Sequence, residues 1–119
     1  MRPANRRCRC GYRSRTTSYE LPVATVAAVL AEVVRGRPRD AGVFSRLRRE
    51  RVQVHPVDTR VGVRGGLLLS GARFGSEKAV DAFVVAVADL AGGAVIATVD
   101  KADLERLAQR ARNVRVAEI

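Results

Sequence analysis

The chain has 119 residues, with 22 lysine and arginine side chains against 12 aspartate and glutamate side chains, and a formal net charge of +10. Hydrophobic residues make up 47% of it, which excludes a disordered basic tail and allows an aliphatic core. Two cysteines and one histidine exclude a disulfide scaffold and argue against a structural zinc site. No apolar run reaches the ~18–20 residues that span a bilayer, so we expect a cytoplasmic protein without membrane contact.

The positive charge is concentrated in the first part of the chain. Residues 1–73 carry 16 cationic and 5 anionic side chains, whereas residues 74–119 carry 6 and 7. Twenty of the cations are arginine, and since Arg, Ala, Val and Gly all have GC-rich codons, part of the excess can reflect genome composition. The uneven distribution still indicates a basic arm or a surface that binds a polyanion.

Residues 1–21 contain six arginines and one acid without apolar periodicity, and they predict a flexible basic arm. A transit peptide has a similar composition and is the alternative. Cys8 and Cys10 form a Cys-x-Cys pair inside this segment. We interpret them as two reduced thiols, because a tetrahedral zinc site needs further ligands that the chain does not supply.

The segment after the arm alternates between apolar and basic stretches. Residues 22–34 are apolar nearly all round, which is typical of a buried helix, although their valines leave a strand open for part of the run. A Gly/Pro-rich loop follows, and residues 40–51 predict a short amphipathic helix that begins near Asp40. Residues 52–64 alternate and predict an extended or hairpin-like chain.

Residues 65–110 predict a strand–helix–strand–helix unit. The predicted elements are a buried strand over 67–70, a helix over 77–91 capped by Ser76, a buried strand over 94–99, a helix capped by Asp100, and an edge strand over 113–119. This order predicts one α/β domain over residues 22–119, with a parallel or mixed sheet flanked by helices.

The run from Gly65 to Leu107 resembles the C-terminal half of Mrr-type restriction-endonuclease domains. LLLS, GARFGSEKA, AVIATVD and KADLERL follow one another here, where that family has a strand ending in Ser, a Gly-Phe-Ser/Thr turn, a strand ending in Asp and an acidic-Leu helix. Arg73 stands where the family has Gly. The resemblance implies a restriction-endonuclease-like PD-(D/E)xK fold, in which carboxylates bind Mg²⁺ and a lysine steadies the developing charge. No lysine precedes residue 65, so no catalytic residue is carried over.

Arginines supply the candidate site. A guanidinium group forks onto phosphate oxygens, and such contacts position a protein on a nucleic-acid backbone without distinguishing its sequence. The arginines of the Gly/Pro loop and of the polar side of the helix over 40–51 are Arg35, Arg37, Arg39, Arg46, Arg48 and Arg49. We therefore expect a non-specific DNA- or RNA-binding domain without its own active site or cofactor, acting alone or as a homo- or hetero-oligomer.

Two other functions stay open. The first is a Mg²⁺-dependent endonuclease with a divergent site, for which the candidate metal ligands are Glu32, Asp40 and Asp58. The second is a protein-interaction subunit in which residues 22–34 form an exposed, partner-binding helix. Residues 71–78 match no phosphate-loop motif and predict a tight turn, and His55 beside Asp58 lacks a placed nucleophile.

Overall fold

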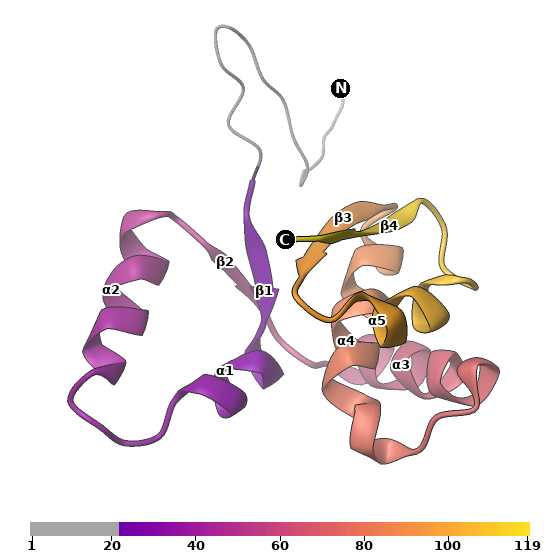
Figure 1. The fold of residues 1–119 in the computed structure, drawn as a ribbon, viewed down its shortest axis with the longest axis horizontal. Helices are drawn as coiled ribbons and strands as arrows, with labels where there is room; N and C mark the ends of the chain where they lie inside the picture. Colours follow the sequence, from indigo (N-terminus) through magenta and orange to yellow (C-terminus); the bar gives the residue numbers. More distant parts are fainter. Residues whose placement is uncertain (1–21) are drawn as a thin grey trace, which may run out of the picture. The chain divides into compact units, whose positions relative to one another are not determined.

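A computed structural model describes residues 22–119, and its contacts divide them into two compact units, residues 22–56 and Val57–Ile119 (Figure 1). Each unit contains helices and one small parallel sheet, which confirms the α/β class. The basic arm over residues 1–21, with Cys8 and Cys10, lies outside the described residues. The expectation of one domain over residues 22–119 stays a prediction.

In the first unit a short strand, β1 (Ala24–Val26), runs directly into the helix α1 (Ala27–Val33). The helix α2 (Asp40–Arg49) then returns the chain to the strand β2 (Gln53–His55), which pairs with β1 in parallel. The amphipathic helix predicted to begin near Asp40 is therefore confirmed.

The prediction of a buried helix over residues 22–34 is wrong in part, and the strand left open for part of this run is confirmed. Its first part is the strand β1, where β-branched Thr25 and Val26 fit a pleated surface and Val26 is buried. The helical part, α1, has no buried residue in the described part of the chain, and Val33 is 44% exposed. Part of the apolar surface of α1 is thus exposed in this unit.

The second unit consists of α3 (Thr59–Ala72), the 3₁₀ turn η1 (Ser76–Lys78), α4 (Ala79–Leu90), β3 (Ala94–Thr98), α5 (Lys101–Ala108) and β4 (Val114–Glu118). Strands β3 and β4 pair in parallel, and α5 makes the crossover between them (Figure 1). The predicted strands over 94–99 and 113–119 are confirmed, as is a helix that begins after Asp100, but the Asp100 side chain makes no capping hydrogen bond to it. The helix predicted over 77–91 is also present, but it follows a 3₁₀ turn, and Ser76 does not cap it.

The predicted strand over residues 67–70 is wrong. LLLS lies inside α3, where Leu68 is buried and Leu67 is 58% exposed, the one-sided burial of a helix. A run of four apolar residues does not distinguish a buried strand from a buried helix by periodicity. The Asp58 carboxylate accepts a hydrogen bond from the Val61 N–H at 3.0 Å and begins this helix, so the extended chain predicted over 52–64 is confirmed only within β2.

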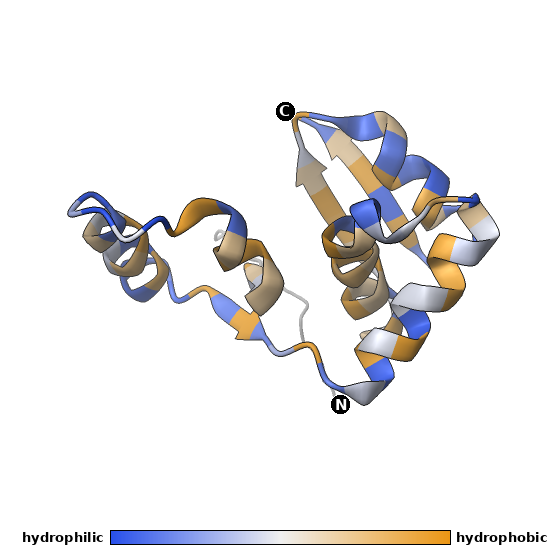
Figure 2. Ribbon diagram, turned by 90° about the horizontal axis from the view of Figure 1, so that it is seen from below, coloured by the Kyte–Doolittle hydropathy of each residue, from blue (hydrophilic) through white to orange (hydrophobic). Residues whose placement is uncertain are grey.

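Helices α3 and α4 pack closely in the core of the second unit. Gly65 permits this contact, because a Cβ atom there would lie 3.0 Å from Cδ1 of Phe83. Leu68, Val85 and Leu107 are the largest fully buried side chains. The hydropathy colouring in Figure 2 shows that α4 is hydrophobic over most of its length, as expected for the central helix of this core.

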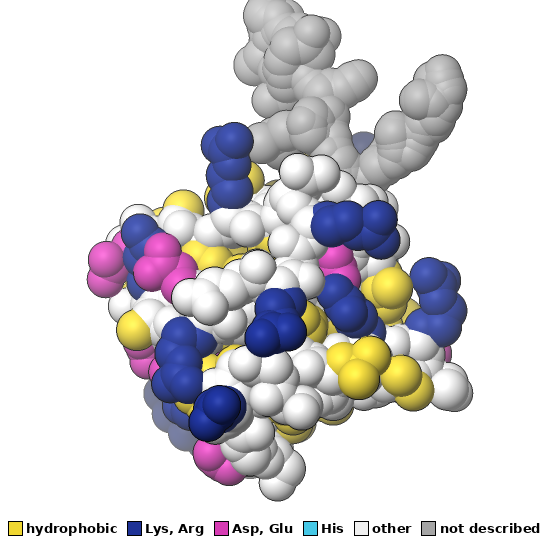
Figure 3. Space-filling view, turned by 90° about the vertical axis from the view of Figure 1, so that its right-hand side faces the viewer, with side chains coloured by type: hydrophobic (Ala, Val, Ile, Leu, Met, Phe, Trp, Pro, Cys, Tyr) yellow, Lys and Arg dark blue, Asp and Glu magenta, His cyan; other side chains and the backbone are white. Residues whose placement is uncertain are grey.

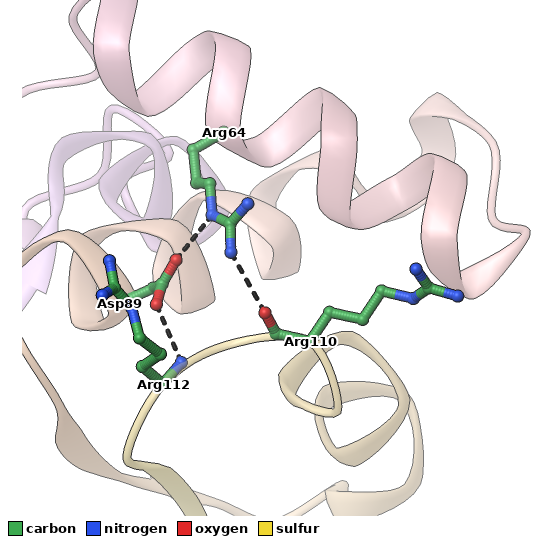
Figure 4. Close-up of polar contacts among 4 residues, drawn as sticks. All are labelled: Arg64, Asp89, Arg110 and Arg112. Carbon is green, nitrogen blue, oxygen red and sulfur yellow. Dashed lines mark hydrogen bonds and ion pairs between the residues drawn. The ribbon is translucent and has the colours of Figure 1, made fainter.

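Asp89 is a buried carboxylate of α4 that joins three segments (Figure 4). Its Oδ2 accepts a hydrogen bond from Nε of Arg64 in α3 at 2.5 Å, and its Oδ1 accepts one from the Arg112 backbone N–H at 2.8 Å. Arg64 also donates through Nη2 to the Arg110 carbonyl at 3.0 Å. Burial acts to raise the pKa of Asp89, but the hydrogen bonds from Arg112 and Arg64 outweigh burial and lower it. The ionised carboxylate thus connects α4 to α3 and to the turn before β4.

Replacing Asp89 with asparagine should lower the free energy of unfolding by about 2–3 kcal/mol, because the change breaks a buried ion pair. Urea unfolding monitored by circular dichroism measures this loss. The matched control is Glu105→Gln, since the Lys101–Glu105 pair joins Nζ and Oε2 at 3.6 Å between side chains 40% and 54% exposed. The control should change stability by less than about 0.5 kcal/mol. Equal losses in the two variants would contradict the role given to Asp89.

Candidate nucleic-acid interface

The loop between α1 and α2 is folded around one carboxylate. Oδ2 of Asp40 accepts hydrogen bonds from the backbone N–H groups of Arg35, Gly36 and Arg37 at 3.0, 2.7 and 3.0 Å. Gly36 has a φ of +74°, a conformation that glycine adopts without steric cost. Asp40 itself is 7% exposed. The loop backbone therefore turns toward Asp40.

Hydrogen bonding keeps Asp40 ionised. Burial acts to raise the pKa of its carboxyl group, but hydrogen bonds from the backbone amides of Arg37, Arg35 and Gly36, with the positive charge of Arg35, lower the pKa below its ordinary value. The sequence predicted Asp40 at the start of a helix but not this contact. A carboxylate at the end of a Gly/Pro-rich loop, three to five residues after the amides that it binds, was the available signal.

The six arginines predicted to bind phosphate are all exposed. We call them the loop–α2 arginines: Arg35, Arg37, Arg39, Arg46, Arg48 and Arg49. The side chain of Arg35 makes structural contacts, because its Nη1 donates hydrogen bonds to the carbonyls of Ala31 and Val34 at 2.6 and 3.0 Å. It closes the C-terminal end of α1.

The other loop–α2 arginines have few partners. Nε of Arg46 lies 3.6 Å from Oε2 of Glu50, with the two side chains 70% and 57% exposed, so solvent screens this pair strongly. Within residues 22–119, no ion pair or side-chain hydrogen bond involves the guanidinium groups of the remaining four, Arg37, Arg39, Arg48 and Arg49. Their charges are available to a ligand.

The second unit brings together charged groups that the sequence analysis did not connect. Nζ of Lys78 lies 2.6 Å from Oδ2 of Asp103 in the first turn of α5. This hydrogen bond and the charge of Asp103 raise the pKa of Lys78; burial opposes the shift, and the charges of Asp81 and Asp100 add to it. We call Lys78, Asp81, Asp100 and Asp103 the Lys78 cluster. The i, i+3 spacings of Lys78 with Asp81 and of Asp100 with Asp103 were the signals in the sequence.

The Lys78 cluster lies where β3 ends and α5 begins. Open α/β sheets bind their ligands beyond the carboxyl ends of parallel strands, so this is a favourable position for a ligand site.

The three candidate metal ligands predicted from sequence have other roles or positions in the structure. Asp40 holds the loop, Asp58 caps α3, and Glu32 lies exposed on α1. Across the described residues, no three His, Cys, Asp or Glu side chains are grouped closely enough to hold a metal ion.

Comparison with protein-family models, curated proteins and solved structures finds no match for this chain. In the part of the chain that the structure describes, every helix is too short or too polar to cross a membrane. The function must therefore be argued from the residues themselves.

Loss of the Asp40 charge should release the loop amides. Because the pKa of Asp40 is lowered in the folded protein, its stabilising contacts are present above about pH 4 and are lost as the pH falls through the folded value. Hydrogen-exchange protection of the amides of residues 35–37, measured by NMR, should fall over that range. Asp40→Asn should lower this protection already at pH 7, whereas Asp58→Asn should leave it unchanged. Protection that is independent of both pH and Asp40 would contradict the role given to this carboxylate.

Proposed function

We propose that this protein binds nucleic acid non-specifically, with the loop–α2 arginines contacting backbone phosphates. The observation that carries the proposal is the exposure of Arg37, Arg39, Arg48 and Arg49 without a described carboxylate partner. An exposed guanidinium group donates two parallel hydrogen bonds to a phosphate, and it releases the counterions that the phosphate held. The partner proposed is DNA or RNA, and no cofactor is required.

The charge balance of the first unit supports a polyanionic partner. Its described residues, 22–56, contain seven arginines and three acids. Of these acids, Asp40 is buried by the loop, and Glu50 faces Arg46 at 3.6 Å. The exposed side chains of the described part of this unit therefore include seven arginines against two acids, Glu32 and Glu50, and such a surface attracts polyanions over a Debye length of about 10 Å in 0.1 M salt.

We retain a relation to restriction-endonuclease-like domains as part of the proposal, but for a shorter stretch of the chain than the sequence suggested. LLLS is helical, so the first strand of the resemblance is missing. AVIATVD and KADLERL retain the expected order, a strand followed by a helix that begins after Asp100. The resemblance thus supports a nucleic-acid partner through residues 94–107 alone.

Reversing two unpaired charges tests the proposed surface. Arg48→Glu with Arg49→Glu should weaken binding to a short DNA duplex more than tenfold in 0.1 M salt, because each phosphate contact contributes a factor of roughly 8 there. The loss should be the same for duplexes of different sequence, since phosphate contacts carry no sequence information. Fluorescence anisotropy with labelled duplexes measures both effects.

A matched control separates a surface contact from a change in net charge. Arg60 and Arg115 are exposed residues of the second unit, so Arg60→Glu with Arg115→Glu alters the net charge by the same amount. Their reversal should weaken binding less than threefold. If the control pair weakens binding as much as the Arg48 and Arg49 pair, the assignment to the loop–α2 arginines is wrong.

A second candidate function, a Mg²⁺-dependent nuclease, is favoured by the Lys78 cluster. Mg²⁺ in proteins keeps several waters and is held by one or two carboxylates together with substrate phosphates, so the aspartates of the cluster fit such an ion although no three of them enclose it. When bound, the ion polarises a phosphoryl oxygen and activates water. Lys78 holds Asp103 in place and adds a positive charge beside it.

The nuclease candidate has a direct test. The purified protein is incubated with labelled single-stranded RNA, single-stranded DNA and duplex DNA in Mg²⁺ or Mn²⁺. The candidate predicts cleavage that a chelator abolishes and that Asp81→Asn or Asp100→Asn reduces more than tenfold, with exposed Glu105→Gln as the control. Absence of metal-dependent cleavage on all three substrates would contradict it, and nucleic-acid binding would stand alone.

A further inference from the structure

Three arginines gather at the C-terminal end of α3, in the second unit. Arg73 follows the last residue of that helix, and Arg106 and Arg110 reach it from α5 and from the turn after α5. All three are exposed. We call them the α3-end arginines. They belong to neither the loop–α2 arginines nor the Lys78 cluster.

Arg106 is fixed by two contacts. Its Nη2 donates a hydrogen bond to the carbonyl of Ala72, the last residue of α3, at 2.5 Å. Its guanidinium carbon lies 4.3 Å from the centroid of the Phe74 ring. Arg106 thus supplies the donor for the Ala72 carbonyl, while the backbone N–H groups of Arg73 and Phe74 bond the carbonyls of Ser70 and Leu69.

Arg110 lies along α3 because the helix has a glycine there. A Cβ atom on Gly71 would be 2.7 Å from Cδ of Arg110 and 2.9 Å from its Nε, so only glycine leaves room for this side chain. Figure 4 shows the Arg110 side chain extending along α3, away from Asp89, while its carbonyl accepts the hydrogen bond from Arg64. The backbone contact is structural, and the side chain is left available.

Arg73 completes the group in a conformation that arginine seldom adopts. Its φ of +61° places it in the left-handed region, where glycine or asparagine is favoured. Within residues 22–119, no ion pair involves Arg73, Arg106 or Arg110. The three arginines thus add positive charge about residues 71–74 without a carboxylate partner among the described residues.

We infer that the α3-end arginines form a second contact surface for nucleic-acid phosphates. The inference rests on the proposed function for the class of partner and on different residues for the contact. Arg106 donates to the Ala72 carbonyl and the backbone N–H of Arg73 caps α3, so neither contact occupies the guanidinium group of Arg73 or Arg110. Two separate arginine surfaces on one chain suit a long polyanion better than a single small anion, because linked contacts strengthen each other. Figure 3 shows one face on which basic side chains lie scattered among acidic, hydrophobic and other side chains.

The test removes two charges without disturbing the helix end. Arg73→Asn introduces a residue that tolerates the left-handed conformation, Arg110→Gln keeps the backbone carbonyl that binds Arg64, and Arg106 is left unchanged. In the full chain, the double variant should lower affinity for a labelled DNA duplex more than tenfold in 0.1 M salt. It should also make the slope of log K against log salt shallower by about 1.8, the value for two phosphate contacts. The matched control is Arg60→Gln with Arg115→Gln, which removes the same charge and should leave the slope unchanged.

A pair of uncharged substitutions isolates the position of Arg110. Gly71→Ala displaces the Arg110 side chain, whereas Gly66→Ala in the same helix meets no atom within 4 Å. The first should weaken duplex binding about threefold to tenfold, and the second should leave it unchanged. Both variants keep the net charge of the chain.

The outcomes separate this inference from the proposed function. If the Arg73 and Arg110 variant binds like its control while the Arg48 and Arg49 variant is weakened, the inference is wrong and the proposed function stands. If the reverse holds, the α3-end arginines are the contact surface and the loop–α2 assignment is wrong. A wild-type chain that binds neither DNA nor RNA in dilute buffer overturns both.

Discussion

Two buried aspartates, both satisfied by donors within the fold, determine how charge is distributed in this protein. Asp40 accepts three backbone N–H groups, and Asp89 accepts an arginine side chain and a further backbone N–H. In both cases hydrogen bonding outweighs burial and keeps the carboxyl group ionised. A buried carboxylate without such donors would be costly, so these contacts are a condition of each unit's fold.

One consequence is that Asp40 and Asp89 make their hydrogen bonds inside the fold rather than with the guanidinium groups of the loop–α2 arginines or the α3-end arginines. Asp40 is held by a loop whose own arginines lie exposed, and Asp89 forms an ion pair with Arg64 at 2.5 Å. The loop–α2 arginines and the α3-end arginines are left facing solvent. The Lys78 cluster differs, because lysine and aspartate neutralise each other there. Phosphate binding and metal-dependent chemistry are thus assigned to different residues.

The sequence predicted the second unit well where local signals agree. Gly92 and Gly93 separate an apolar helix from an apolar strand, and Asp100 marks the next helix, so α4, β3, α5 and β4 were all foreseen. The strand predicted for LLLS is wrong because three consecutive leucines, Leu67 to Leu69, are compatible with a strand or a helix. The Asp58 cap and the close packing of Gly65 against Phe83 stabilise the helix. The burial predicted for residues 22–34 is wrong because burial depends on tertiary contacts, which the spacing of apolar residues along the chain does not specify.

For the candidate site, sequence gave the residue types and their exposure but not their contacts. The Arg35 guanidinium donates to the carbonyls of Ala31 and Val34, a contact that the residue type does not reveal, and the Lys78 cluster joins segments more than 20 residues apart. The most direct test of the account is the salt dependence of duplex binding by the wild-type chain. We predict a linear fall of log K with log salt, with a slope of about −0.9 for each phosphate contacted and a magnitude well above 2. A slope near zero, or no binding in dilute buffer, would contradict the account.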